Sequence, residues 1–242
     1  MLKSRPLTDV CYRFSGPLTG GRLVRRYKRF LADVELDDGV LATVHCPNSG
    51  SMLGCLEIGA RVYCSPSAKP GRRTAFTWEM ICISEQWIGI NTAIPNELIA
   101  QAARMQAHPI FHGATRVARE VRIGSHTRFD LVVERETGLL YVEVKNVTLV
   151  RSGEAHFPDA VTARGAKHLE QLMALVDAGH AAAMVYVVQR QDARAFGPAE
   201  DIDATYARLY REARAKGVVM VPVEARVSPQ AICLVRELPL LL

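Results

Sequence analysis

The sequence predicts a two-domain protein of mixed α and β structure, in which a small β-barrel precedes an α/β domain. Three observations lead to this prediction. The 242-residue chain is long enough to bury two hydrophobic cores. Before residue 90, short runs of alternating apolar residues are separated by Gly and Pro turns. After residue 90, helical periodicity alternates with apolar strands. We therefore expect domains at 1–90 and 91–242.

The N-terminal domain is expected to be an OB-like β-barrel. Apolar alternation predicts a strand over 23–36, and Asp37-Asp38-Gly39 supplies a hairpin turn before a second strand over 40–45. Further strands are predicted over 60–65 and 75–84. The loop between these two strands carries Lys69, Arg72 and Arg73. Barrels of this type commonly bind nucleic acids, although the fold alone does not establish that role.

The C-terminal domain is expected to be an α/β sheet covered by helices on both faces. The predicted helices cover residues 95–105, 160–177 and 203–216, and Asp159 is the expected N-cap of the second. The predicted strands cover residues 117–123, 128–134, 139–147, 182–188 and 218–223.

The composition is that of a water-soluble globular protein, with 49% hydrophobic and 23% charged residues. No apolar run approaches the roughly 20 residues that span a bilayer, and the N-terminus lacks the apolar segment of a secretory signal. We therefore expect a cytoplasmic protein with no membrane partner. The six cysteines form no Cys-x-x-Cys pair, so we expect reduced, mostly buried thiols without disulfides.

Positive charge is concentrated near the N-terminus. Residues 1–90 carry 12 Lys and Arg against 8 Asp and Glu. The densest group, interleaved with Tyr27 and Phe30, consists of Arg22, Arg25, Arg26, Lys28 and Arg29. Such a group is typical of a surface that binds a phosphate backbone and stacks bases. The alternative is a solvated strand edge protected by charge.

A predicted hairpin over residues 128–146 carries the strongest candidate site. Glu143 and Lys145 lie on one face of their strand because side chains alternate, and Asp130 of the preceding strand can meet them. Two carboxylates can hold Mg²⁺ or Mn²⁺, and a lysine can orient a water against a phosphate. This pattern predicts a metal-dependent phosphodiesterase site, whereas the alternative is a charged pair on an exposed strand.

Further basic residues flank this candidate site. Arg128 lies two positions before Asp130 and on the same face of the strand. On the following helix, Arg164, Lys167 and His168 form a polar stripe that could contact a nucleic-acid backbone. A solvated helix face is the alternative. Glu97 and Glu120 are spare carboxylates that could also reach a metal.

Several motifs occur in order along the chain. They are Val44-His45-Cys46-Pro47-Asn48-Ser49-Gly50-Ser51-Met52, Asn91-Thr92, Pro95-Asn96, Arg128-Phe129-Asp130, Val142-Glu143-Val144-Lys145-Asn146-Val147-Thr148-Leu149, Phe157-Pro158-Asp159-Ala160-Val161-Thr162, Arg164-Gly165 and Lys167-His168-Leu169. With this set of motifs, the chain resembles the sugar fermentation stimulation protein A family.

The resemblance implies an OB-like domain followed by a domain similar to PD-(D/E)xK nucleases, with Asp130, Glu143 and Lys145 as the nuclease-like triplet. It also implies DNA binding without sequence preference and a regulatory link to maltose metabolism. Two hypotheses follow. The protein is a DNA-binding regulator whose nuclease-like domain mainly binds, or it is an active Mg²⁺- or Mn²⁺-dependent nuclease that cleaves DNA or RNA.

Overall fold

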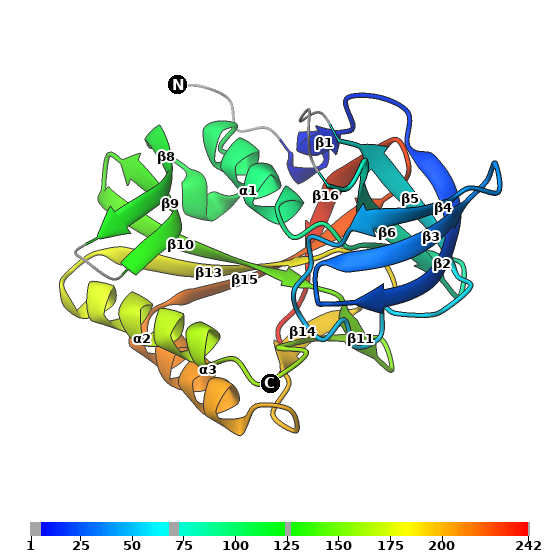
Figure 1. The fold of residues 1–242 in the computed structure, drawn as a ribbon. Helices are drawn as coiled ribbons and strands as arrows, with labels where there is room; N and C mark the ends of the chain where they lie inside the picture. The colour runs from blue at the N-terminus through cyan, green and yellow to red at the C-terminus, as the bar shows by residue number, and fades with distance from the viewer. Residues whose placement is uncertain (1–5, 68–72, 124–126, 242) are drawn as a thin grey trace.

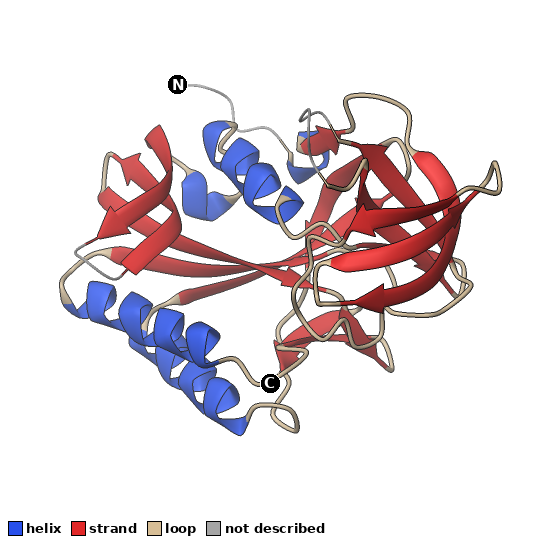
Figure 2. Ribbon diagram, in the orientation of Figure 1, coloured by secondary structure: helices blue, strands red, loops and turns tan. Residues whose placement is uncertain are grey.

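The computed structural model describes residues 6–67, 73–123 and 127–241, and shows a β-barrel packed against a mixed α+β domain (Figures 1 and 2). Lys69 and Arg72 of the predicted basic loop lie outside the described residues. The barrel strands are β2 (Thr19–Tyr27), β3 (Leu31–Leu36), β4 (Leu41–His45), β5 (Arg61–Pro66), β6 (Phe76–Ile83) and β7 (Gln86–Gly89).

The barrel is a closed, five-stranded structure, in which the single predicted strand over 23–36 forms parts of two strands, β2 and β3. Its strands run in the order β4-β3-β2-β5-β6, and a parallel pairing of His45 in β4 with Thr77 in β6 closes the ring. Strand β7 extends β6 as a hairpin. The interior is filled by apolar side chains that alternate along the strands, among them the fully buried Leu23, Val34 and Trp78. The expected OB-like barrel is confirmed.

The second domain is built on a mixed seven-stranded sheet with the order β1-β16-β15-β13-β10-β9-β8. Its strands are β1 (Cys11–Arg13), β8 (Ala114–Ile123), β9 (Thr127–Arg135), β10 (Gly138–Val147), β13 (Ala181–Val188), β15 (Val219–Val227) and β16 (Ala231–Glu237). A smaller sheet combines β11 (Leu149–Arg151), β12 (Glu154–Phe157) and β14 (Ala195–Pro198).

Helices cover both faces of the large sheet (Figure 2). Helix α1 (Ile94–Arg104) packs on one face, and α2 (Ala163–Asp177) and α3 (Ala204–Lys216) pack together on the other. Short 3₁₀ turns occupy Leu7–Asp9 and Pro109–Phe111. Because both faces are covered, central strands such as Ala181–Val188 are almost entirely apolar.

The predicted strand over 23–36 is wrong, because the chain reverses direction within it. Lys28 and Arg29 both have positive φ, at 49° and 61°, and the segment after them returns as β3 beside β2. The sequence contains no Gly, Asn or Asp at this turn, so the usual signal of left-handed backbone is missing. The reversal places both basic residues at a hairpin tip.

The second helix begins at Ala163 rather than at the expected residue 160, and its N-cap is Thr162. The Thr162 hydroxyl accepts a hydrogen bond from the Gly165 N–H at 3.0 Å. Asp159 is therefore not the N-cap. Its carboxylate instead accepts bonds from the Ser51 hydroxyl and the Met52 N–H, both at 2.9 Å, and so joins the barrel to the second domain.

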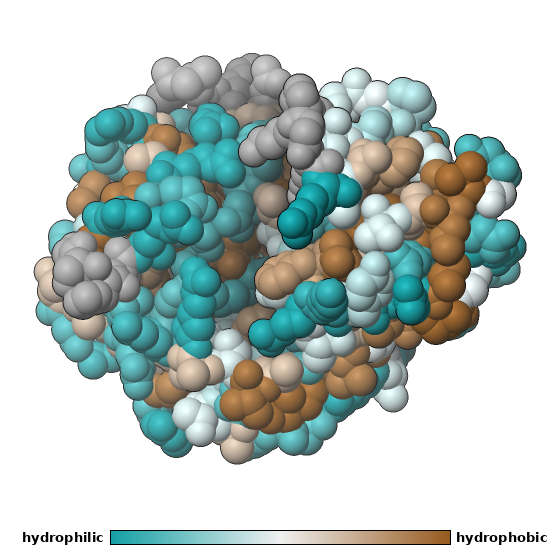
Figure 3. Space-filling view, in the orientation of Figure 1, coloured by the Kyte–Doolittle hydropathy of each residue, from teal (hydrophilic) through white to brown (hydrophobic). Residues whose placement is uncertain are grey.

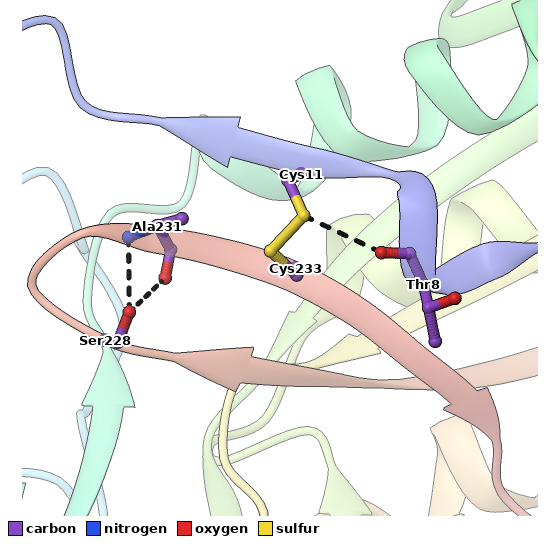
Figure 4. The surroundings of a disulfide bond; sticks show 5 residues. All are labelled: Thr8, Cys11, Ser228, Ala231 and Cys233. Carbon is purple, nitrogen blue, oxygen red and sulfur yellow. Dashed lines mark hydrogen bonds between the residues drawn. A yellow bond between two sulfur atoms is a disulfide. The ribbon is translucent and has the colours of Figure 1, made fainter.

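The N-terminal strand β1 belongs to the large sheet and not to the barrel, although it lies within the predicted range 1–90. It pairs antiparallel with β16, and Cys11 stands directly opposite Cys233. These two cysteines form a disulfide (Figure 4). The expectation of six reduced cysteines is therefore wrong, because strand pairing brings together two residues that lie 222 positions apart.

Further bonds tie the two domains together. The Gln189 amide donates to the carbonyls of Gly89 and Asn91, both at 3.3 Å. The buried Arg190 guanidinium donates to the Gly54 carbonyl at 3.3 Å. The barrel is thus held at the end of the large sheet. Among the described residues, no helix combines the length and apolar character needed to cross a membrane.

Candidate metal and nucleic-acid site

Asp130 lies where strands β9 and β10 separate. Regular pairing between them ends at Leu131 and Val142, and the Asp130 carboxylate then accepts the Val144 N–H at 2.8 Å in place of a backbone partner. Its other oxygen accepts from the Asn96 side chain of α1 at 2.9 Å. Two fixed donors on different elements therefore hold the carboxylate in one orientation.

Glu143 and Lys145 lie on the same face of β10, as the alternation predicts, and His168 of α2 joins them. Lys145 Nζ is 2.6 Å from Glu143 Oε1 and 3.0 Å from His168 Nδ1. The His168 Nδ1 atom also contacts Glu143 Oε1 directly. Glu143 and His168 are buried, with 3% and 7% of their surface exposed. The three groups form a compact polar cluster beneath α2.

The pKa values of the two carboxyl groups are shifted in opposite directions. Burial raises the pKa of Asp130 to about 6, and the neighbouring negative charge of Glu143 is the second largest cause of this rise. Burial also acts to raise the pKa of Glu143, but the hydrogen bond from His168 and the positive charge of Lys145 outweigh it, so that pKa lies below its ordinary value. Glu143 is therefore an anion at neutral pH.

One atom of this cluster lacks a partner. Glu143 Oε2 is buried and accepts no hydrogen bond from the described residues. An unsatisfied, buried carboxylate oxygen is costly, and a cation is the group that would satisfy it best. The donor set of Asp130 and Glu143 therefore fits a hard divalent cation such as Mg²⁺ or Mn²⁺.

The protein ligands alone would not complete such a coordination sphere. In the described parts of the chain, no three His, Cys, Asp or Glu side chains are grouped to hold a metal ion. Mg²⁺ commonly binds through one or two carboxylates and keeps waters or phosphate oxygens as its remaining ligands. Two carboxylates are therefore enough for a Mg²⁺ ion that keeps waters as its remaining ligands.

The surface is hollowed over part of the large sheet, to which β10 belongs (Figures 1 and 3). Mostly hydrophilic residues surround this hollow (Figure 3). Lys145 keeps 13% of its side chain exposed, whereas Glu143 keeps 4%. The lysine is thus the more accessible member of the pair.

Two arginines of the predicted basic group on the barrel, Arg25 and Arg26, bind other protein groups. Arg26 is half-buried and donates through one nitrogen to the carbonyls of Arg29, Asn48 and Gly50, so it braces the loop 48–50. Arg25 bonds Asp33 at 2.7 Å and lies over the Tyr27 ring. These arginines already have protein partners.

The remaining predicted nucleic-acid contacts are exposed. Lys28 and Arg29 occupy the tip between β2 and β3, and Arg164 and Lys167 lie on the outer side of α2. Two others are exposed but engaged: Arg22 donates to the Gly59 carbonyl at 2.9 Å and Arg128 pairs with Glu120 at 2.9 Å.

His168 does not belong to the exposed stripe in which the sequence placed it, because α2 turns this side chain inward to Glu143. The spare carboxylates also lie apart from the cluster, since Glu97 pairs with Arg119 and Glu120 pairs with Arg128. The hydrogen bond from Asn96 to Asp130 was not predicted from the sequence. The only sequence signal for it is the position of Asn96 directly after Pro95, in the first turn of α1.

The fold and the site define a two-part protein that joins an OB-type barrel to a mixed α+β domain with a buried carboxylate, lysine and histidine cluster. Residues 24–90 match the family model "SfsA N-terminal OB domain", and residues 93–231 match "Sugar fermentation stimulation protein RE domain". The chain belongs to the sugar fermentation stimulation protein family.

Curated relatives agree with this assignment. The chain is 48% identical over 225 residues to a sugar fermentation stimulation protein homolog of Geobacter sulfurreducens, covering 93% of this chain and 97% of the relative. It is 49% identical over 226 residues to the homolog of Pelobacter propionicus, covering 93% and 98%.

A solved structure has the same fold. It is described as Pyrococcus furiosus SfsA in complex with Ca²⁺, and it superimposes with a TM-score of 0.87 at 24% identity over 96% of this chain and 98% of that one.

Proposed function

We propose that the protein binds DNA without sequence preference and holds a divalent cation between Asp130 and Glu143. The observation that carries the proposal is the buried, unpartnered Oε2 atom of Glu143 beside a second carboxylate. The related Pyrococcus furiosus protein is described in complex with Ca²⁺, a cation that prefers the same oxygen ligands.

Exposed cations supply the proposed contacts to the phosphate backbone. The best placed are Lys28 and Arg29 on the barrel and Arg164 and Lys167 on α2, because they are exposed. Contacts of this kind recognise phosphates and not base edges, so they give affinity without sequence preference. DNA is the proposed partner, and RNA shares the same phosphate chemistry.

Fluorescence anisotropy with two labelled duplexes of unrelated sequence tests this binding. Equal affinities are expected, and both should fall at least tenfold between about 50 and about 200 mM salt as counterion release weakens. The double variant Lys28→Ala/Arg29→Ala should bind more weakly with a smaller salt dependence. Affinity that does not change with salt, or that differs strongly between the two duplexes, would contradict the proposal.

A second candidate function is cleavage of DNA or RNA, and the contact of Lys145 with Glu143 favours it. A cation bound there would supply Lewis-acid activation of a phosphate and of a bound water. Lys145 Nζ, 2.6 Å from Glu143 Oε1, is positioned to orient that water or to neutralise charge on the phosphate.

Incubation of single-stranded, duplex and branched DNA and of RNA with Mg²⁺ or Mn²⁺ tests the second candidate. Lys145→Ala should lower the cleavage rate by roughly 10² or more if the lysine acts on the reacting groups. Arg208→Ala, on the outer side of α3, is the matched control and should cleave normally. Equal cleavage by the Lys145→Ala variant would remove Lys145 from the reaction.

A regulatory role in sugar metabolism, including maltose metabolism, completes the proposal. Its support is the name that the relatives carry. If regulation acts through DNA binding, the Lys28→Ala/Arg29→Ala variant should change the transcript levels of sugar-use genes in the native host in the same way as deletion of the gene that encodes this protein. Transcripts that respond to the deletion but not to this variant would separate the role from DNA binding.

A further inference from the structure

Two cavities adjoin each other between the barrel and the start of α2. The outer cavity has a volume of about 440 Å³ and lies between the loop 49–51 and the segment 157–162. The inner cavity has a volume of about 150 Å³ and reaches the end of β10. Gly50, Phe157 and Asp159 line both. The outer volume is in the range of sites for small ligands.

The outer cavity carries positive charge. Arg26 and Arg29 line it, and no partner of the Arg29 guanidinium is found among the described residues. The one carboxylate in its wall, Asp159, is already engaged by the Ser51 hydroxyl and the Met52 N–H. The exposed guanidinium of Arg29 therefore favours an anionic group, and a guanidinium matches phosphate geometry.

The inner cavity has the features of a site for a planar heterocycle. Phe157 is fixed by ring contacts with Tyr186 and Tyr206, at centroid distances of 5.8 and 5.2 Å, and lines the cavity wall. His156 lines the same cavity, and its Nδ1 atom is buried without a hydrogen-bond partner in the described structure. The aromatic surface of Phe157 suits the face of a nucleobase.

The inner cavity is close in sequence and strand position to the cluster of Glu143, Lys145 and His168. Asn146 and Val147 line it and follow Lys145 directly in β10. At roughly 3.3 Å per residue in a strand, the backbone of Val147 lies about 7 Å along β10 from that of Lys145.

We propose that the two cavities form a subsite for one unpaired nucleotide, with its phosphate against Arg29 and its base beside Phe157 and His156. This inference rests on the proposed nucleic-acid binding and specifies the substrate further. A nucleotide must leave the base stack to enter such a pocket, so the subsite selects single strands, frayed ends or flipped bases over intact duplex.

Calorimetric titration of the full chain in EDTA tests the subsite without any cleavage. The probes are dAMP, deoxyadenosine and inorganic phosphate. The subsite predicts that dAMP binds more tightly than either fragment, since it engages both cavities. Arg29→Ala should weaken dAMP binding by about tenfold, the size of one charge-assisted hydrogen bond.

Two further variants complete the design. Ser49→Trp adds bulk at an exposed position of the outer wall and should abolish dAMP binding while thermal unfolding stays unchanged. Arg208→Ala, which removes an exposed arginine on α3, should bind dAMP as the wild type does.

The possible outcomes separate this inference from the proposed function. The subsite is wrong if dAMP does not bind, if phosphate binds as tightly as dAMP, or if Ser49→Trp binds normally. If duplex DNA binding persists in that case, the proposed function stands without the subsite. If dAMP binding depends on Arg29 but duplex DNA does not bind, the subsite stands and the proposed function fails.

Discussion

The ammonium group of Lys145 lies 3.0 Å from Nδ1 of His168, and both groups are directed at the same oxygen of Glu143. Strand β10 supplies two members of this cluster and helix α2 supplies the third. Glu143 is therefore held by two donors through Oε1, whereas its buried Oε2 has no hydrogen-bond partner among the described residues.

Replacement of His168 by Ala should destabilise the protein at neutral pH by about 1–3 kcal/mol, because a buried carboxylate loses a hydrogen bond. The pKa of Glu143 in the folded state lies below its ordinary value. This stabilisation is therefore fully present at pH values above the pKa of Glu143 in the unfolded chain, and it is lost as pH falls through the lower pKa of the folded state. Urea unfolding at pH 7 and at progressively lower pH measures it. A difference that stays constant down to acidic pH would contradict the assignment.

Divalent cations should stabilise the protein more at pH 8 than at pH 5. Asp130 has a folded pKa of about 6, above the ordinary value of 3.8, so the folded state favours its protonated form. This contribution to the free energy of unfolding is lost as pH rises through 6, where Asp130 becomes an anion. A bound cation stabilises that anion and so offsets the loss. Thermal unfolding with Mn²⁺ or EDTA at both pH values measures the effect. Asp130→Asn should remove the Mn²⁺ shift. An equal shift at pH 5 and pH 8 would show binding elsewhere.

Asp159→Ala should weaken the junction between the domains. The substitution removes acceptors for the Ser51 hydroxyl and the Met52 N–H, and we expect a loss of about 1–3 kcal/mol in the free energy of unfolding. Chemical denaturation measures it. Asp201→Ala is the matched control, because its ion pair with Arg151 is exposed and should contribute nothing measurable. If the two substitutions lower the free energy of unfolding equally, the contacts of Asp159 with Ser51 and Met52 do not stabilise the junction between the domains.

Reduction of the Cys11–Cys233 disulfide should lower stability, because it frees β1 from its covalent link to β16. We expect a loss in the usual range of about 2–4 kcal/mol, which Cys11→Ser should reproduce. Cys82→Ser, at a free and partly exposed cysteine, should have little effect. Thiol titration of the unfolded, unreduced chain checks the bond: four free thiols are expected, and six would refute it.

Much of the site could be predicted from the sequence because local periodicity determines it. Alternation along one strand was enough to place Glu143 and Lys145 on the same face, and the hairpin order brought Asp130 to them. The closed barrel followed from short strands and turn residues in the same way.

The remaining features depend on tertiary contacts that no local pattern carries. Helical periodicity put His168 in a polar stripe, but the packing of α2 against the sheet turned it to Glu143. The turn at Lys28 and Arg29 has positive φ without a turn-forming residue. The Cys11–Cys233 pair depends on the pairing of the first and last strands of the chain.

Anomalous diffraction from crystals soaked in Mn²⁺ shows whether Asp130 and Glu143 hold a cation. A manganese peak is expected between the two carboxylates, in contact with Glu143 Oε2, and no such peak is expected in Glu143→Gln crystals treated identically. A map without density at that position, or a peak that persists unchanged in the Glu143→Gln crystals, would contradict the claim that these two residues form a metal site.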